Sequence, residues 1–228
     1  MNQMNQVMRI DRLFDLSHTI AAELFQGRTY PWEVLGDIGE FTVKLGGTLG
    51  DEYEYREGDI WIAKDAKIAP TASITGPCII DSGAEIRHCA YIRGKAIIGK
   101  GCVVGNSVEV KNAVIFDGAQ VPHFNYVGDS VLGWRAHMGA GAVTSNIKSD
   151  KTNVTIMFGD ARITTGLRKF GAMLGDGVEV GCNSVLCPGT VIGRDSTIYP
   201  LSRVRGFIAE GSIFKAPDNI VKKTGKEV

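Results

Sequence analysis

Two of the four histidines, His123 and His137, lie in a stretch of sequence that could support proton transfer. Histidine accepts a proton near neutral pH, which is what a general base for acyl transfer to an amine has to do. The dipeptide Pro122-His123 also interrupts the local pattern, and departures from a strong pattern often mark functional positions. His123 is therefore the candidate base, and the alternative is an inert surface histidine. His18 and His88 have no informative surroundings.

Charged residues near His123 recur at spacings that a repeating fold can bring together. Arg93 and Lys111 are eighteen residues apart. If that distance is one turn of a coil, the two cations lie on one face about 4.8 Å apart along its axis and can hold a phosphate or carboxylate. The alternative is two solvated charges. Glu109 precedes His123 by fourteen residues, so its carboxylate can lie on the adjacent turn and orient the imidazole.

The segments that must position these residues follow a repeat of six. Stepping by six from Ile62 meets a β-branched aliphatic residue nine times in succession, and the fourth residue after each is apolar and small or medium-sized. A period of six fits neither an α-helix nor an alternating strand. The β-branched positions are Ile62, Ile68, Ile74, Ile80, Ile86, Ile92, Ile98, Val104 and Val110.

Such a chain turns a corner every six residues, and three segments complete one turn of a triangular coil whose strands pair in parallel. The β-branched residues suit an extended backbone and point inward, while glycines such as Gly83 fit the corners. The pattern breaks over residues 144–171 and resumes at Leu174. The sequence therefore predicts an all-β solenoid, a parallel β-helix of hexapeptide repeats over residues 62–210, with an inserted loop at 144–171.

The two ends of the chain have different patterns. Ser17 can cap a helix over residues 20–25, and Pro31 suits the first position of a second helix. Because the open end of a coil needs covering, residues 1–61 are predicted to form a small helical N-terminal cap, the alternative being an arm that docks a partner. Residues 211–228 are rich in lysine and are predicted to be a solvated C-terminal tail.

Composition excludes several classes of function. Lys+Arg and Asp+Glu both number 25, so no net charge favours binding to nucleic acid or to an anionic membrane. No apolar run is long enough to cross a bilayer, and the N-terminus lacks the apolar core of a secretory signal. The five cysteines form no Cys-x-x-Cys pair, so we expect neither a metal site nor disulfides, but reduced thiols in the cytoplasm.

Three motifs resemble the acetyltransferase domain of bifunctional N-acetylglucosamine-1-phosphate uridyltransferases, the glucosamine-1-phosphate acetyltransferases. They are Gly-Asn-Ser-Val-Glu-Val-Lys at 105–111, His-Phe-Asn-Tyr-Val-Gly-Asp at 123–129 and Met-Gly-Ala-Gly-Ala-Val-Thr-Ser-Asn at 138–146. The segment Ile-Thr-Thr-Gly-Leu-Arg-Lys-Phe-Gly-Ala at 163–172 is similar to archaeal-type sugar-1-phosphate nucleotidylyltransferases that carry the same β-helix. The resemblance covers roughly residues 62–206 and implies that the β-helix is left-handed.

The resemblance also implies a role for each matching residue. His123 is implied to accept the amine proton, with Glu109 orienting it. Ala140 is implied to present its backbone N–H to the acetyl carbonyl, and Cys182 to line the acetyl-CoA channel. The residues implied to bind the sugar phosphate are Arg93, Lys111, Tyr126, His137, Asn146 and Lys151.

Two of these positions depart from the family pattern. His137 stands where the family has a sugar-binding asparagine, and Lys151 is shifted by one residue from the family's loop lysine, which falls at Thr152. The Gly-rich nucleotide-binding loop is missing, so we expect no nucleotidyltransferase domain and no synthesis of UDP-sugars.

These features predict an acyl-CoA-dependent N-acetyltransferase of an amino-sugar phosphate, with acetyl-CoA as co-substrate. The resemblance implies a homotrimer whose active site lies between neighbouring β-helices. The altered loop and His137 motivate one alternative, a non-catalytic sugar-phosphate-binding or assembly subunit. A second alternative is a zinc-dependent hydratase of the carbonic anhydrase type, with His123 and His137 as ligands.

Overall fold

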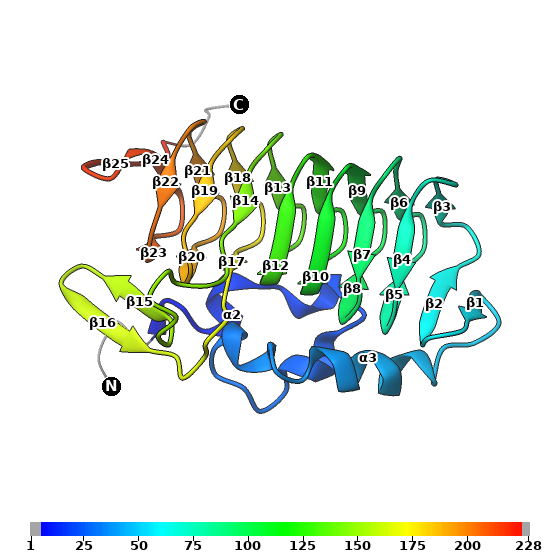
Figure 1. Cartoon of the computed structure of the whole chain (residues 1–228). Coiled ribbons are helices and arrows are strands. Elements are labelled where there is room, and N and C mark those ends of the chain that lie inside the picture. Colours follow the sequence, from blue (N-terminus) through cyan, green and yellow to red (C-terminus); the bar gives the residue numbers. More distant parts are fainter. Residues whose placement is uncertain (1–5, 225–228) are drawn as a thin grey trace.

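The chain winds into a coil of short strands, each paired in parallel with the strand one turn later (Figure 1). The structure is a computed structural model that describes residues 6–224. Ile62, Ile80 and Ile98 occupy one position on three successive turns, and that spacing of eighteen residues equals three hexapeptides. The predicted left-handed parallel β-helix of hexapeptide repeats is confirmed.

The strands form three faces, numbered here in the order in which the chain visits them. The first face contains β2 (Ile60–Ala63), β5 (Cys78–Ile80), β8 (Ala96–Ile98), the C-terminal halves of β10 (Glu109–Ile115) and β12 (Tyr126–Leu132), β17 (Ala172–Leu174), β20 (Thr190–Ile192) and β23 (Phe207–Ile208). The second contains β3 (Lys67–Ile68), β6 (Glu85–Ile86), β9 (Val103–Asn106), β11 (Gln120–His123), β13 (His137–Met138), β18 (Glu179–Val180), β21 (Thr197–Ile198) and β24 (Ser212–Ala216). The third contains β4 (Ser73–Thr75), β7 (Tyr91–Arg93), the N-terminal halves of β10 and β12, β14 (Val143–Thr144), β19 (Val185–Leu186) and β22 (Arg203–Val204).

The interior of the coil is filled by the repeated aliphatic residues that the sequence pattern identified. Ile80, Ile86 and Ile98 are buried, and Ala84 and Ala90 occupy the tighter positions between them. β-Branched side chains favour the extended backbone of the strands, and burying each one stabilises the fold by about 1.5–3 kcal/mol. The repeat therefore both bends the chain and holds its turns together.

The N-terminal segment lies along the first face of the coil (Figure 1). It contains α2 (Ile10–Leu13), η1 (Leu16–His18), η2 (Ala22–Phe25), η3 (Pro31–Val34) and α3 (Ile38–Gly46). The sequence analysis expected this segment to cover an end of the coil. The segment instead covers the first face, which carries a row of outward-facing aliphatic side chains. That row is Ile79, Ile97, Val114, Val131, Met173 and Val191.

Two segments expected to be irregular contain strands. Within the insertion, β15 (Thr155–Phe158) and β16 (Ala161–Thr164) form an antiparallel hairpin. At the C-terminus, β24 continues the coil beside β21 and pairs with β25 (Asn219–Lys222), and Phe214 is buried in the core. At the other end, β1 (Tyr53–Arg56) forms a hairpin with β2. The remainder of the predicted tail, residues 225–228, lies outside the described residues.

Within residues 6–224, we find no helix with the length and apolar character needed to cross a membrane.

Candidate active site

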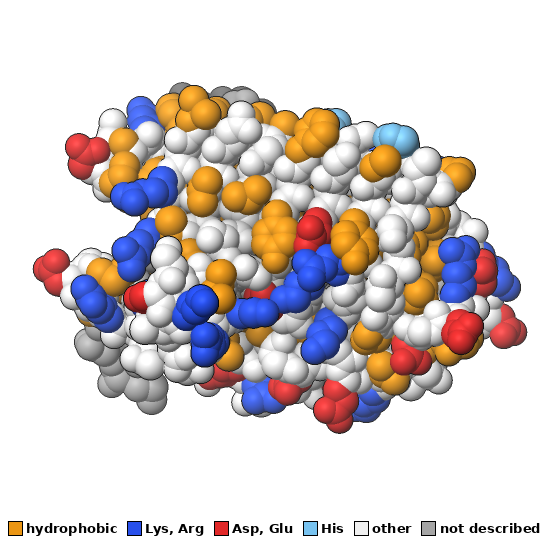
Figure 2. Space-filling model, in the orientation of Figure 1, with side chains coloured by type: hydrophobic (Ala, Val, Ile, Leu, Met, Phe, Trp, Pro, Cys, Tyr) orange, Lys and Arg blue, Asp and Glu red, His pale blue; other side chains and the backbone are white. Residues whose placement is uncertain are grey.

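The predicted phosphate-binding cations lie side by side on the third face. Tyr91 pairs with Glu109 in register, so Arg93 on β7 and Lys111 on β10 occupy the same position on adjacent turns, as their spacing predicts. Lys and Arg side chains gather near the middle of this face (Figure 2). Two cations about 4.8 Å apart along the axis suit an anionic group.

Arg93 makes an ion pair with Glu109, and its Nη1 lies 2.5 Å from the carboxylate Oε1. The carboxylate raises the pKa of the guanidinium. Among the described residues no hydrogen bond joins Glu109 to His123, which differs from the predicted orienting contact. The reason is topological, since Glu109 begins the third-face half of β10 whereas His123 ends β11 on the second face.

Asp129 joins Lys111 to two asparagines and was given no role by the sequence analysis. Its carboxylate accepts from Lys111 Nζ at 3.1 Å, Asn112 Nδ2 at 2.9 Å and Asn146 Nδ2 at 2.5 Å. Only 4 % of Asp129 is exposed, so this negative charge depends on those donors. Asp129 closes the 123–129 motif, which was the available signal.

Tyr126 and Asn146, which are both predicted to bind the sugar phosphate, also contact each other. The Asn146 amide nitrogen donates to the Tyr126 hydroxyl at 3.0 Å. Burial raises the pKa of Tyr126, and the nearby charges of Asp129 and Glu109 raise it further. The phenol therefore stays protonated at neutral pH and can donate a hydrogen bond to a ligand.

His123 lies at the corner between the second and third faces and is exposed. Asn125 fixes this corner, because its buried side chain accepts from the His123 N–H at 3.1 Å and donates to the carbonyls of Gly139 and Ala142. The backbone therefore holds the imidazole at a defined edge. No hydrogen bond to the ring is formed by the residues that the structure describes.

Ala140 and Cys182 follow His123 along the same corner. Gly141 N donates to the His123 carbonyl at 3.0 Å, and Asn183 N donates to the Ala140 carbonyl at 2.8 Å. The three residues therefore occupy successive turns. Within the described chain, the Ala140 N–H makes no hydrogen bond, which leaves it available to an oxyanion.

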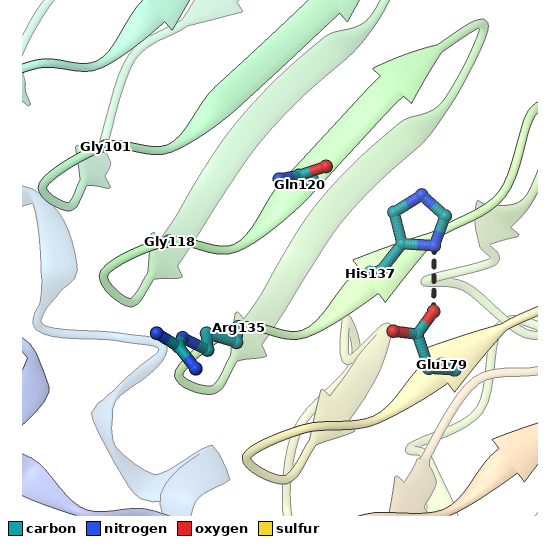
Figure 3. Close-up of a pocket in the computed structure, with 6 residues that line it drawn as sticks. All are labelled: Gly101, Gly118, Gln120, Arg135, His137 and Glu179. Carbon is teal, nitrogen blue, oxygen red and sulfur yellow. Dashed lines mark hydrogen bonds and ion pairs between the residues drawn. The ribbon is translucent and has the colours of Figure 1, made fainter.

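His137 and Lys151 are not joined to this cluster. His137 lies on the second face, in register with Gln120 and Glu179, and its Nδ1 lies 3.0 Å from Glu179 Oε2 (Figure 3). The two side chains line a hollow of about 550 Å³, which is also lined by Gly101 and Gly118. Lys151 is exposed in the insertion. The residues predicted to bind the sugar phosphate are thus divided between two faces of the protomer.

Within residues 6–224, no group of three or more His, Cys, Asp or Glu side chains is arranged to hold a metal ion. Cys78 and Cys102 are buried, and burial raises the pKa of each thiol to about 12.

The chain matches a known protein family and several curated proteins. A protein-family model described as GMPPB C-terminal domain matches residues 74–191. The chain is 38% identical over 192 residues to a bifunctional sugar-1-phosphate nucleotidylyltransferase/acetyltransferase of Sulfurisphaera tokodaii, which covers 81% of this chain and 47% of the relative. It is 31% identical over 212 residues to a bifunctional protein GlmU of Methanococcus aeolicus, covering 81% and 51%. The chain thus spans about half the length of these curated relatives.

Among solved structures, the acetyltransferase domain of PglB from Neisseria gonorrhoeae has 13% sequence identity and a TM-score of 0.35. The match covers 72% of this chain and 57% of that one. The resemblance to the bifunctional uridyltransferase family, first seen in the motifs, is confirmed by the curated relatives.

Proposed function

Since the chain belongs to the GMPPB C-terminal domain family and is similar to bifunctional nucleotidylyltransferase/acetyltransferases, we propose that it is an acetyl-CoA-dependent N-acetyltransferase of an amino-sugar phosphate. The observation that carries this proposal is the corner at which His123 and the free Ala140 N–H lie one turn apart, next to the anion-binding face of Arg93 and Lys111. A base, an oxyanion donor and an anion site are the parts that the reaction requires.

In the proposed reaction the acceptor amine attacks the thioester carbonyl of acetyl-CoA directly. The new C–N bond forms as the C–S bond breaks, and the amine proton passes to His123 and then to the CoA thiolate. The Ala140 N–H stabilises the oxyanion, and Cys182 lines the channel for the thioester. Tyr126 and Asn146 hold the sugar, while Arg93 and Lys111 bind its phosphate.

We further propose that the protein is a cytoplasmic homotrimer. In one protomer His137 and the Lys111 cluster lie on different faces of the coil. Two such faces meet when coils pack around a threefold axis, because each protomer then presents a different face to each neighbour. The hollow beside His137 would in that case adjoin the Lys111 cluster of the next subunit.

The direct test is release of CoA thiol from acetyl-CoA in the presence of glucosamine 1-phosphate. We expect His123→Ala to lower kcat by about 10²–10⁴-fold, the contribution of a positioned base. His88→Ala is the matched control, because His88 is also an exposed histidine, in the turn between β6 and β7, and should leave kcat unchanged. Wild-type turnover in His123→Ala would exclude the proposed mechanism. Sugar-phosphate binding without thiol release would instead support the non-catalytic subunit.

A further inference from the structure

One buried side chain, that of Asn112, joins the N-terminal segment to the proposed acceptor site. Asn112 lies in the middle of β10, where this strand passes from the third face to the first. Its amide nitrogen donates to the carbonyl of Leu35 at 3.1 Å and to Asp129 Oδ1 at 2.9 Å. The amide has two N–H groups, so it serves one partner in the segment and one in the site.

The bond from Asn112 determines how the carboxylate of Asp129 is turned. Asn112 holds Oδ1, whereas Lys111 Nζ and Asn146 Nδ2 lie closest to the other oxygen, Oδ2, at 3.1 Å and 2.5 Å. The last torsion of an aspartate side chain has broad minima, so a carboxylate without its donor at Oδ1 is free to turn. Asn112 therefore fixes where Lys111 and Asn146 lie.

The same part of the N-terminal segment reaches the site at a second point. Trp32 lies in η3, three residues before Leu35, and its ring stacks on Phe170 with the ring centroids 5.8 Å apart. Phe170 is fully buried, and its N–H donates to the Asn146 carbonyl at 2.9 Å. Residues 32–35 thus support the side chain of Asp129 through Asn112 and the backbone of Asn146 through Phe170.

The backbone conformation of Asn112 offers a competing explanation for the residue. Its φ is +47°, in the left-handed region that asparagine adopts more readily than most residues do. Glycine meets this requirement at least as well, but it has no amide to place between Leu35 and Asp129. A glycine substitution therefore separates the conformational role of Asn112 from its role as a hydrogen-bond donor.

We infer that Asn112 is a positioning residue for the acceptor, and that it makes the N-terminal segment part of the structure that shapes the acceptor site. This inference rests on the proposed function for the identity of the acceptor and for the roles of Lys111 and Asn146. The proposed reaction gives no role to Asn112 or to the segment. The segment therefore does more than cover the aliphatic row of the first face.

The test measures binding of glucosamine 1-phosphate to the full chain by calorimetry without acyl-CoA, so it does not depend on turnover. Asn112→Gly should weaken binding about three- to tenfold, because the freed carboxylate no longer fixes its two other partners. Asp176→Ala is the matched control. It also loosens the N-terminal segment, by removing the acceptor of the Asp15 N–H, but between the first and second faces, and should leave the affinity unchanged. Urea unfolding checks that both variants fold.

A double-mutant cycle with Asp129→Asn decides whether Asn112 acts through Asp129. If it does, the double variant should bind about as weakly as the weaker single variant, rather than by the product of the two effects. The inference is overturned if Asn112→Gly binds normally, if Asp176→Ala weakens binding equally, or if the two effects multiply. The expected binding pattern without thiol release would leave the inference standing and reject the proposed function alone.

Discussion

Asp129 holds the proposed acceptor site together, since it is the common hydrogen-bond acceptor for Lys111, Asn112 and Asn146. Its backbone has a φ of +49°, a conformation that asparagine tolerates better than alanine does. We therefore expect Asp129→Asn to fold, to lose the charge that fixes Lys111, and to raise the acceptor KM about tenfold with little change in kcat. Steady-state kinetics would check this, and an unchanged KM would show that Asp129 does not position the site.

One substitution can show whether Glu109 neutralises Arg93 or orients His123. Because Glu109 neutralises Arg93 in this structure, Glu109→Gln should free the guanidinium and lower the acceptor KM severalfold. The pH profile of kcat should keep its shape. If Glu109 orients His123 in the assembled enzyme, the same variant would instead lose kcat by tenfold or more and shift the acidic limb of that profile.

Tyr126 gives a prediction for alkaline pH. Its pKa is raised from the ordinary value of 10.0, so the hydroxyl remains a donor where a free phenol would begin to ionise. Tyr126→Phe should raise the acceptor KM by a factor of about 5–10, the worth of one hydrogen bond. Between about pH 7 and pH 10 the ratio of variant to wild-type KM should fall by less than the roughly twofold expected of a phenol with the ordinary pKa of 10.0. A fall of about twofold or more by pH 10 would mean that the hydroxyl ionises normally.

At the scale of elements, Asp176 attaches the N-terminal segment to the coil. Its carboxylate accepts from the backbone N–H groups of Asp15 at 2.7 Å and Trp134 at 2.8 Å, and its own N–H donates to the Leu13 carbonyl. Asp176→Ala leaves two donors without partners, which costs about 2–4 kcal/mol of unfolding free energy. Urea unfolding would measure this, with Asp160→Ala on the exposed hairpin as the neutral control.

The pH dependence of this effect has a defined sign. Burial raises the pKa of Asp176 above its ordinary value of 3.8. A carboxyl group whose pKa is raised on folding contributes most below its unfolded pKa, and the contribution falls as the pH rises through the folded pKa. The difference in stability between wild type and Asp176→Ala should therefore be larger below about pH 4 than at pH 7. The opposite trend would show that the ionised form is the one favoured by folding.

The repeat made the strands predictable, because each hexapeptide has one inward aliphatic residue and a strand misplaced by one position would expose it. The position of the N-terminal segment depends on outward residues such as Ile79, Ile97 and Val114, whose recurrence is hidden beneath the stronger inward pattern. The adjacency of Arg93 and Lys111 followed from the spacing alone. The pairing of Glu109 with Arg93 could not be predicted, because the spacing of these residues does not say which neighbouring side chain each one contacts. The position of His123 could not be predicted either, because it depends on the corner that the Asn125 side chain fixes.

At the scale of the whole molecule, the division of the predicted sugar-binding residues between two faces favours a site shared by subunits. We expect sedimentation equilibrium to give three times the chain mass, with no loss of the trimer at assay concentrations. A monomer with full activity would contradict the shared site. Dilution below the dissociation constant of the trimer should abolish turnover, because an isolated protomer would lack the part of the pocket that its neighbour supplies.

Mixed trimers test the shared site most sharply. Lys111→Ala damages the third face, and His137→Ala damages the second; each homotrimer should lose at least about tenfold in kcat/KM for the acceptor. If each site joins the third face of one subunit to the second face of the next, any trimer that contains both variants has one interface with both faces intact. Co-expressed chains with different tags, purified on both tags in turn, should then recover roughly a third of wild-type activity. Sites built within single protomers would give no recovery, because every chain in such a trimer carries one of the two substitutions.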